Sequence, residues 1–186
     1  MSDHTKYALA RSLDKVLQKK PLDKITISDL TDDCGVNRQT FYYHFHDIYD
    51  LIEWIYVTWA NKAIGPNRNY ANWQEGMIDM CNLMLDNRSF LLKTYHSRTG
   101  GHLHRILLER SYDLLIGVIN ELSKGVPISE ENKAFIADFY KYGFAGLVVE
   151  WINDGMKEDP KKMVRRLEKL IQGNFPEAIR RFADYQ

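Results

Sequence analysis

Apolar residues recur along this chain at helical spacing, and the stretches that they define are separated by few helix-breaking residues. The chain has 5 prolines and 11 glycines, and most of them fall between these stretches. No stretch alternates apolar and polar residues as a half-buried strand does. The sequence therefore predicts an all-α protein of nine to ten helices. The first helix, from about residue 5 to 19, carries a stripe formed by Leu9, Leu13, Val16 and Leu17.

The composition narrows the class of protein. Of the 186 residues, 45% are hydrophobic, which is enough for a core, and the two cysteines are too few for a disulfide framework. Lys plus Arg is 25 and Asp plus Glu is 25, so nucleic-acid binding would require a local patch. The amino terminus is too charged for a signal peptide, and no apolar run approaches the roughly 20 residues of a membrane span. We therefore expect a soluble, cytoplasmic protein without a membrane partner.

Three helices, the first of them short, are expected between residue 26 and the break at GPNRN (65–69). Thr26 is an N-cap candidate with Asp29 at the third helical position, and this helix ends before Gly35. Asn37 can cap the next helix, and Asp47 can cap the one after it. A glycine between two short helices permits the tight turn of a helix-turn-helix, whose second helix enters the DNA major groove.

The segment NRQTFYYHF, residues 37 to 45, predicts a helix with one apolar and one polar side. Phe41 and Phe45 are four residues apart, so they share a face that can pack on the first helix. Gln39 could bind an adenine edge and Arg38 a guanine or a phosphate. The other polar residues suit backbone phosphates. In the alternative interpretation the segment is a capped helical hairpin, in which these polar groups would need buried partners.

The segment ITISDLTDDCGVNRQTFYYHFHDIYDL, residues 25 to 51, resembles the DNA-binding signature of TetR/AcrR-family transcription regulators. The resemblance implies an N-terminal three-helix DNA-binding domain, residues 1–46, that contains the helix-turn-helix. A larger helical-bundle domain for effector sensing and dimerisation, residues 47–186, would follow. The resemblance also implies DNA contacts by Thr26, Asn37, Arg38, Gln39, Thr40, Tyr42, Tyr43 and His44.

Two features depart from the family pattern. Gln39 stands where family members often have glycine, and Ile48 stands where they often have a lysine that contacts phosphate. In addition, residues 1–50 carry seven Lys and Arg against eight Asp, a net charge of minus one. Because salt dependence grows with the number of phosphates neutralised, we expect DNA binding that depends only weakly on salt.

The rest of the chain predicts longer helices, with breaks at GPNRN (65–69) and RTGGH (98–102). A single recognition helix reads few base pairs, so such proteins pair to contact half-sites about one helical turn apart. The apolar helices at 129–156 and 160–171 could form a four-helix interface between two subunits, or their rings could fill the core of one subunit. The helices expected after residue 70 span about 73–86, 89–97, 103–124, 129–156, 160–171 and a short segment after Pro176.

The sequence assigns no ligand, metal or catalytic residues. A methionine- and aromatic-rich middle suits a ligand pocket but equally a core. His96, His102 and His104 lack the spacing of a metal site, and we expect them to be solvated loop histidines. No nucleophile–base spacing or phosphate-binding loop indicates an enzyme, and no cofactor is expected. The residues of the middle segment are Trp73, Met77, Met80, Met84, Phe90, Tyr95 and Tyr112.

These features together favour a homodimeric DNA-binding transcriptional regulator of the TetR type. It would bind a pseudo-palindromic double-stranded operator and respond to a small-molecule effector or a protein co-regulator. RQTFYYHF, with Trp54 and Trp73, is further similar to activators of dihydroxyacetone kinase operons, which implies a kinase-subunit homologue as the partner. The alternatives are a helical enzyme or small-molecule carrier, and a protein-interaction adaptor that does not bind DNA.

Overall fold

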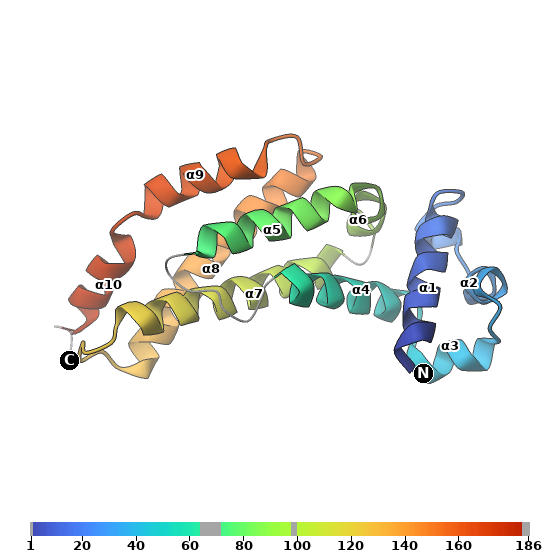
Figure 1. Cartoon of the computed structure of the whole chain (residues 1–186), viewed down its shortest axis with the longest axis horizontal. Coiled ribbons are helices and arrows are strands. Elements are labelled where there is room, and N and C mark those ends of the chain that lie inside the picture. Colours follow the sequence, from blue (N-terminus) through green and yellow to red (C-terminus); the bar gives the residue numbers. More distant parts are fainter. Residues whose placement is uncertain (1, 64–71, 98–99, 184–186) are drawn as a thin grey trace. The chain divides into compact units, whose positions relative to one another are not determined.

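The computed structural model describes residues 2–63, 72–97 and 100–183, and within these ranges the predicted all-α class is confirmed. Among the residues described, one 3-10 turn, η1 (Leu22–Lys24), accompanies the α-helices, which Figure 1 labels. The α-helices are α1 (Ser2–Leu17), α2 (Ile27–Cys34), α3 (Arg38–His44), α4 (Ile48–Ala63), α5 (Trp73–Asp86), α6 (Arg88–Tyr95), α7 (Gly100–Leu122), α8 (Glu130–Asn153), α9 (Pro160–Ile171) and α10 (Asn174–Ala183).

The chain divides into two compact units. The N-terminal unit comprises residues 1–59 and 87–103, and the C-terminal unit comprises residues 60–86 and 104–186. These two units are defined by how closely the backbone packs. The predicted domains, residues 1–46 and 47–186, are instead defined by function, as a DNA-binding part and a regulatory part. The two divisions therefore describe different properties of the chain.

In the N-terminal unit, α1 packs on α2, and α3 packs on α2. Leu9, Leu13, Leu30 and Phe41 are fully buried between these helices. Helix α6 belongs to this unit because Lys93 donates hydrogen bonds from Nζ to the Leu17 carbonyl oxygen at 3.0 Å and to Gln18 Oε1 at 2.8 Å. The buried hydroxyls of Tyr56 in α4 and Thr94 in α6 are also hydrogen-bonded to each other, at 2.6 Å.

In the C-terminal unit, α5 packs along α9, and α10 packs against α8. The Trp73 and Phe144 rings meet in the core with their centroids 5.4 Å apart. Met77 and Met84 are buried with them, so these residues of the methionine- and aromatic-rich middle form part of the core. Of the helices that the structure describes, none combines the length and apolar character needed to cross a membrane.

Two helices begin earlier than the sequence indicated. The prediction of a loop through residue 102 is wrong, because α7 already begins at Gly100. Residues 98 and 99 of that predicted loop, and the whole predicted break GPNRN, lie outside the described residues. Leu103 is buried in the first turn of α7, and this packing outweighs the low helix propensity of the glycines. Helix α10 begins at Asn174, so Pro176 lies in the first turn, where a missing N–H leaves no helical hydrogen bond unmade.

Candidate nucleic-acid interface

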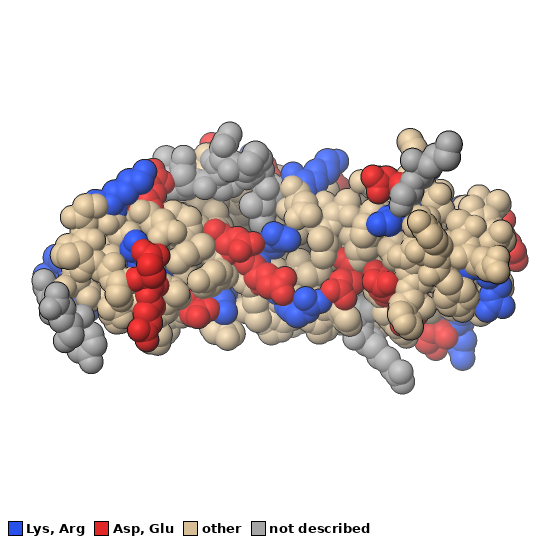
Figure 2. All heavy atoms as spheres, turned by 90° about the horizontal axis from the view of Figure 1, so that it is seen from below, with Lys and Arg blue, Asp and Glu red and all other residues tan. Residues whose placement is uncertain are grey.

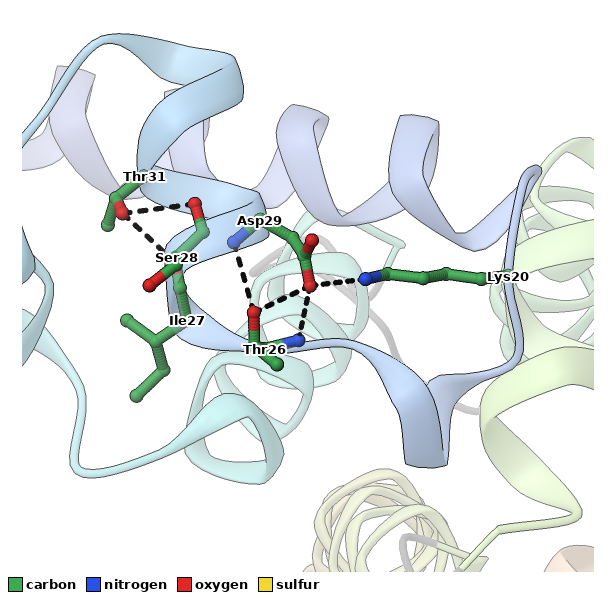
Figure 3. Close-up of polar contacts among 6 residues, drawn as sticks. All are labelled: Lys20, Thr26, Ile27, Ser28, Asp29 and Thr31. Carbon is green, nitrogen blue, oxygen red and sulfur yellow. Dashed lines mark hydrogen bonds and ion pairs between the residues drawn. The ribbon is translucent and has the colours of Figure 1, made fainter.

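The amino end of α2 is held by a capping box, as the sequence predicted. The Thr26 hydroxyl oxygen accepts a hydrogen bond from the Asp29 N–H at 3.3 Å, and Asp29 Oδ2 accepts one from the Thr26 N–H at 2.6 Å. Lys20 pairs with the same carboxylate oxygen (Figure 3). The Thr26 side chain is exposed at the surface, but its hydroxyl is already engaged in the hydrogen bonds of the cap.

A left-handed glycine turns the chain from α2 toward α3. Gly35 has φ 72°, a conformation that side chains with a Cβ rarely adopt. The N–H groups of Gly35 and Val36 both point to the Thr31 carbonyl oxygen, which closes the end of α2. Asn37 follows in an extended conformation and caps α3, since its Oδ1 accepts hydrogen bonds from the Thr40 N–H at 2.8 Å and the Thr40 hydroxyl at 2.9 Å.

Helix α3 is anchored from one side by its phenylalanines. Phe41 is fully buried, Phe45 is 3% exposed, and their ring centroids lie 5.9 Å apart. The Phe45 ring also meets the Trp54 ring of α4 at 5.8 Å. The predicted buried face of the segment is thus confirmed.

The opposite side of α3 is open to solvent. Tyr42 is 54% exposed and Tyr43 82% exposed, and Arg38 and Gln39 are exposed beside them. These four residues, Arg38, Gln39, Tyr42 and Tyr43, are here named the α3 surface. Of the other predicted contact residues, Thr40 and His44 are half-buried, and the Tyr43 and His44 rings meet edge to face at 4.9 Å. The structure therefore brings four predicted residues together at the surface, while Thr26, Asn37 and Thr40 take part in helix caps.

Two lysines near the helix-turn-helix are paired with carboxylates of α2. Lys15 pairs with Asp33, and Lys20 pairs with Asp29. Among the described residues visible in Figure 2, the N-terminal unit, at the right, carries both blue and red side chains and no continuous blue field. The sequence could not indicate these pairs, because each joins residues on two different elements. They leave less positive charge available to phosphates than the count of lysines indicates.

Acid should weaken the capping box at a defined pH. The pairing with Lys20 and the hydrogen bonds from Thr26 lower the pKa of Asp29 from 3.8 to about 2. A folded-state pKa below the unfolded value gives stability that is present above about pH 4 and is lost as pH falls through about 2. We expect the difference in unfolding free energy between the wild type and Asp29→Asn to shrink across this window in urea titrations.

The variant Lys20→Met provides the control for this titration. It removes the largest cause of the lowered pKa, so the loss of stability should be smaller and should be complete at a higher pH than in the wild type. Identical pH profiles for the wild type and Asp29→Asn would contradict the assignment.

His96, His102 and His104 do not come together as a metal site. The prediction that His102 and His104 are loop residues is wrong, since both lie in α7. His102 Nδ1 is 2.6 Å from Glu53 Oε2 of α4 within the N-terminal unit. His96 directly follows α6 and is exposed. Over residues 2–63, 72–97 and 100–183, no group of three or more potential ligands is placed to hold a metal ion.

Helix α8 carries apolar residues on two sides. Phe144, Val148, Trp151 and Ile152 are buried in the C-terminal unit. Phe135, Phe139, Tyr142 and Leu147 are exposed, and with the exposed Gly143 and Gly146 they form a surface here named the α8 stripe. A groove of about 670 Å³ continues from Leu147 to the exposed Leu170 of α9.

Comparison with known proteins agrees with this architecture. Residues 13–55 match the family described as bacterial regulatory proteins, tetR family, and residues 71–173 match a transcriptional regulator C-terminal region. The HTH-type dhaKLM operon transcriptional activator DhaS of Lactococcus lactis subsp. lactis is 25% identical over 91 residues. That match spans 49% of this chain and about half, 49%, of the relative.

A solved structure, the dihydroxyacetone kinase operon activator DhaS, has the same fold. It aligns with 96% of this chain and 97% of its own chain, with a TM-score of 0.71 and 22% sequence identity. The matched C-terminal region alone covers more than half of the present chain, and the helix-turn-helix lies within the other matched region. The chain therefore belongs to the TetR family of DNA-binding transcriptional regulators.

Proposed function

We propose that this regulator binds a pseudo-palindromic double-stranded operator as a homodimer, with the α3 surface of each subunit in the major groove. The observation that carries this proposal is the exposure of the α3 surface, whose helix is anchored from behind by buried Phe41 and Phe45. Residues 1–46 form the DNA-binding domain in this proposal, and residues 47–186 sense the effector and dimerise. Because the operator lies in the bacterial cytoplasm, the regulator acts there.

Each residue of the interface has a role that suits its chemistry. Arg38 and Gln39 present the side chains that pair bidentately with guanine and adenine edges, respectively. Tyr42, Tyr43 and His44 contact phosphates, which set the register of the helix on the duplex. Three further residues, Thr26, Asn37 and Thr40, hold the amino ends of α2 and α3 in place through their caps and lie near the backbone of the bound DNA.

The α8 stripe supports the homodimer. Exposed aromatic residues on one helix are the composition that the centre of a protein interface favours. A Cβ atom built on Gly143 or Gly146 would meet nothing within 4 Å, so each glycine leaves open space for an approaching helix. Two copies of this surface form a self-complementary contact about a twofold axis.

We further propose that an effector, a small molecule or a protein co-regulator, changes the separation of the two α3 helices. An effector that binds one arrangement better than another shifts the population toward it. Both the curated relative and the solved structure are described as the operon activator DhaS, and activation is the mode that we propose here. No catalytic step is part of this mechanism.

Selection from a random pool of duplexes tests the proposal directly. The full-length protein is expected to enrich sequences with two inverted half-sites whose centres are about one helical turn, roughly 10 base pairs, apart. The matched control is the variant Arg38→Ala, which should enrich these half-sites much less strongly. Enrichment of single half-sites would contradict binding as a dimer. A wild-type protein that enriches no sequence would contradict DNA binding itself.

Salt should affect operator binding only weakly. The described lysine pairs and the net charge of minus one over residues 1–50 leave few cations for phosphates. We expect a slope of log affinity against log salt well below the value of about 10 known for a strongly basic repressor. The variant Ile48→Lys should raise the slope by about 0.9, because it adds one phosphate contact at the start of α4. A wild-type slope near 10 in a titration with potassium chloride would contradict this expectation.

A further inference from the structure

One side of α9 carries three cations that have no acidic partner. Lys161, Arg165 and Lys169 are exposed and follow one another at intervals of four residues, so they lie on one side of the helix, about 6 Å apart along its axis. Among the described residues, none of the three forms an ion pair. These three residues, here named the α9 basic stripe, therefore present positive charge that the described part of the chain leaves unpaired.

Exposed cations on nearby helices of the same unit are paired within their own helix. Arg105 Nη1 lies 3.2 Å from Glu109 Oε1 in α7, and Arg180 Nη2 lies 2.8 Å from Glu177 Oε1 in α10. In both pairs the carboxylate stands three or four residues from the cation, an arrangement that stabilises a helix and keeps it solvated. The α9 basic stripe places like charges at the same spacing, where they destabilise the helix. Solvation of α9 alone would not require such an array.

A surface groove between α5 and α9 adjoins the α9 basic stripe. The two helices pack side by side (Figure 1), and Gln74 Nε2 donates a hydrogen bond to Glu168 Oε1 across them at 2.9 Å. The groove has a volume of about 310 Å³. Its lining combines two cations of the stripe, two carboxylates and two apolar side chains, together with Gln74: Lys161, Arg165, Glu75, Glu168, Ile78 and Val164.

This lining fits a polypeptide better than a phosphate backbone. Glu75 and Glu168 would repel phosphates beside the stripe, whereas they can accept hydrogen bonds from the side chains of a protein. The half-buried Ile78 offers apolar surface to a side chain of the partner. Carboxylates four residues apart on a helix repeat at the same interval of about 6 Å as the cations of the stripe. The matching partner surface is therefore an acidic helix.

The interior of the C-terminal unit offers little room to a small molecule at the cavity among α5, α7 and α8. That cavity has a volume of about 20 Å³, which is room for about one water molecule. Pockets for small molecules have volumes of roughly 300–1,000 Å³. An effector that acts on these three helices from their surface avoids this limit.

We propose that the α9 basic stripe and the adjoining groove bind an acidic helical segment of a protein co-regulator. The inference rests on the proposed effector response, and it identifies the effector as a protein. Carboxylates of the segment pair with the three cations and set its register along α9. An apolar side chain of the segment lies in the groove, as in other complexes of a helix with a groove.

Selection from a displayed library of helical peptides tests this proposal on the full-length protein without DNA. Each peptide is an alanine-rich helix of roughly 16 residues, a length at which isolated helices form, with its exposed positions varied. The wild type should enrich peptides that carry Asp or Glu at intervals of four residues and an apolar residue beside them. Enrichment of peptides without this acidic pattern, or of no peptide, would overturn the proposal.

A combined variant tests whether the enriched peptides bind at the stripe. It changes all three cations to glutamine, as Lys161→Gln, Arg165→Gln and Lys169→Gln. The loss of three exposed ion pairs should weaken binding by about threefold to more than a hundredfold in fluorescence anisotropy. Stability in urea should not fall, because the change removes repulsion along α9. Equal affinities for the wild type and the combined variant would overturn the proposal.

The matched control removes the same number of exposed cations elsewhere, as Arg11→Gln, Lys19→Gln and Lys124→Gln. This control should bind the enriched peptides as the wild type does. A loss as large as that of the combined variant would show that net charge alone attracts the peptides, and would overturn the proposal.

A duplex of random sequence and phosphatidylserine vesicles represent the other occupants that such a stripe could have. If either binds more tightly than the enriched peptides and the combined variant abolishes that binding, the stripe belongs to phosphates and the proposal is overturned. Should operator selection fail while acidic peptides are still enriched, DNA binding is contradicted and this site stands.

Discussion

Replacement of Arg38 by alanine is expected to weaken operator binding by roughly fivefold to more than a hundredfold. A bidentate contact of arginine with a guanine edge contributes about 1–3 kcal/mol of discrimination, and Arg38 is the exposed cation on α3. The change leaves the fold intact, because the core of the segment consists of Phe41 and Phe45. Gel-shift titration with a selected duplex and with a duplex altered at the half-site measures both affinity and specificity.

Three further variants identify the origin of this loss. Arg38→Lys retains the charge but cannot form the planar bidentate pair, so specificity should fall more than affinity. Arg11→Ala removes the same charge from the exposed face of α1 and should have a much smaller effect. Tyr42→Phe removes one phosphate contact and should weaken all duplexes about equally. If Arg38→Ala and Arg11→Ala weaken binding by the same factor, the α3 surface does not read bases.

Local signals in the sequence predicted the helix-turn-helix well. Thr26, Asn37 and Asp47 cap helices because each side chain reaches a backbone N–H three residues ahead, an interaction that involves only neighbours in sequence. Gly35 ends α2 because the left-handed turn is most accessible to glycine. Such features depend on a few adjacent residues, so their outcome could be read without knowing the tertiary fold.

Features that depend on distant parts of the chain could not be predicted in this way. Helical spacing indicated that Phe135, Phe139 and Phe144 are apolar positions of one helix, but not that Phe144 is buried while the other two are exposed. The packing of α6 in the N-terminal unit rests on Lys93 and the end of α1, more than 70 residues away in sequence. A small cavity of about 20 Å³ likewise requires three helices, α5, α7 and α8, to come together.

Replacement of Phe139 by aspartate is expected to separate the proposed homodimer into subunits. Phe139 is 69% exposed in the single chain and lies in the α8 stripe, beside the open positions of Gly143 and Gly146. A large aromatic residue at the centre of an interface contributes 2 kcal/mol or more, and a buried carboxylate without a partner adds a further cost. We expect the dimer dissociation constant to rise at least about thirtyfold.

Mass measurement by light scattering or sedimentation distinguishes the outcomes. The variant should approach the chain mass of 21.8 kDa at concentrations where the wild type has twice that mass. Helix content should stay unchanged, because Phe139 takes no part in the buried core. Asn82→Asp introduces the same charge on the exposed side of α5 and should remain dimeric. Since one subunit reaches only one half-site, Phe139→Asp should also lose most operator affinity. A dimeric Phe139→Asp variant would place the subunit interface elsewhere than the α8 stripe.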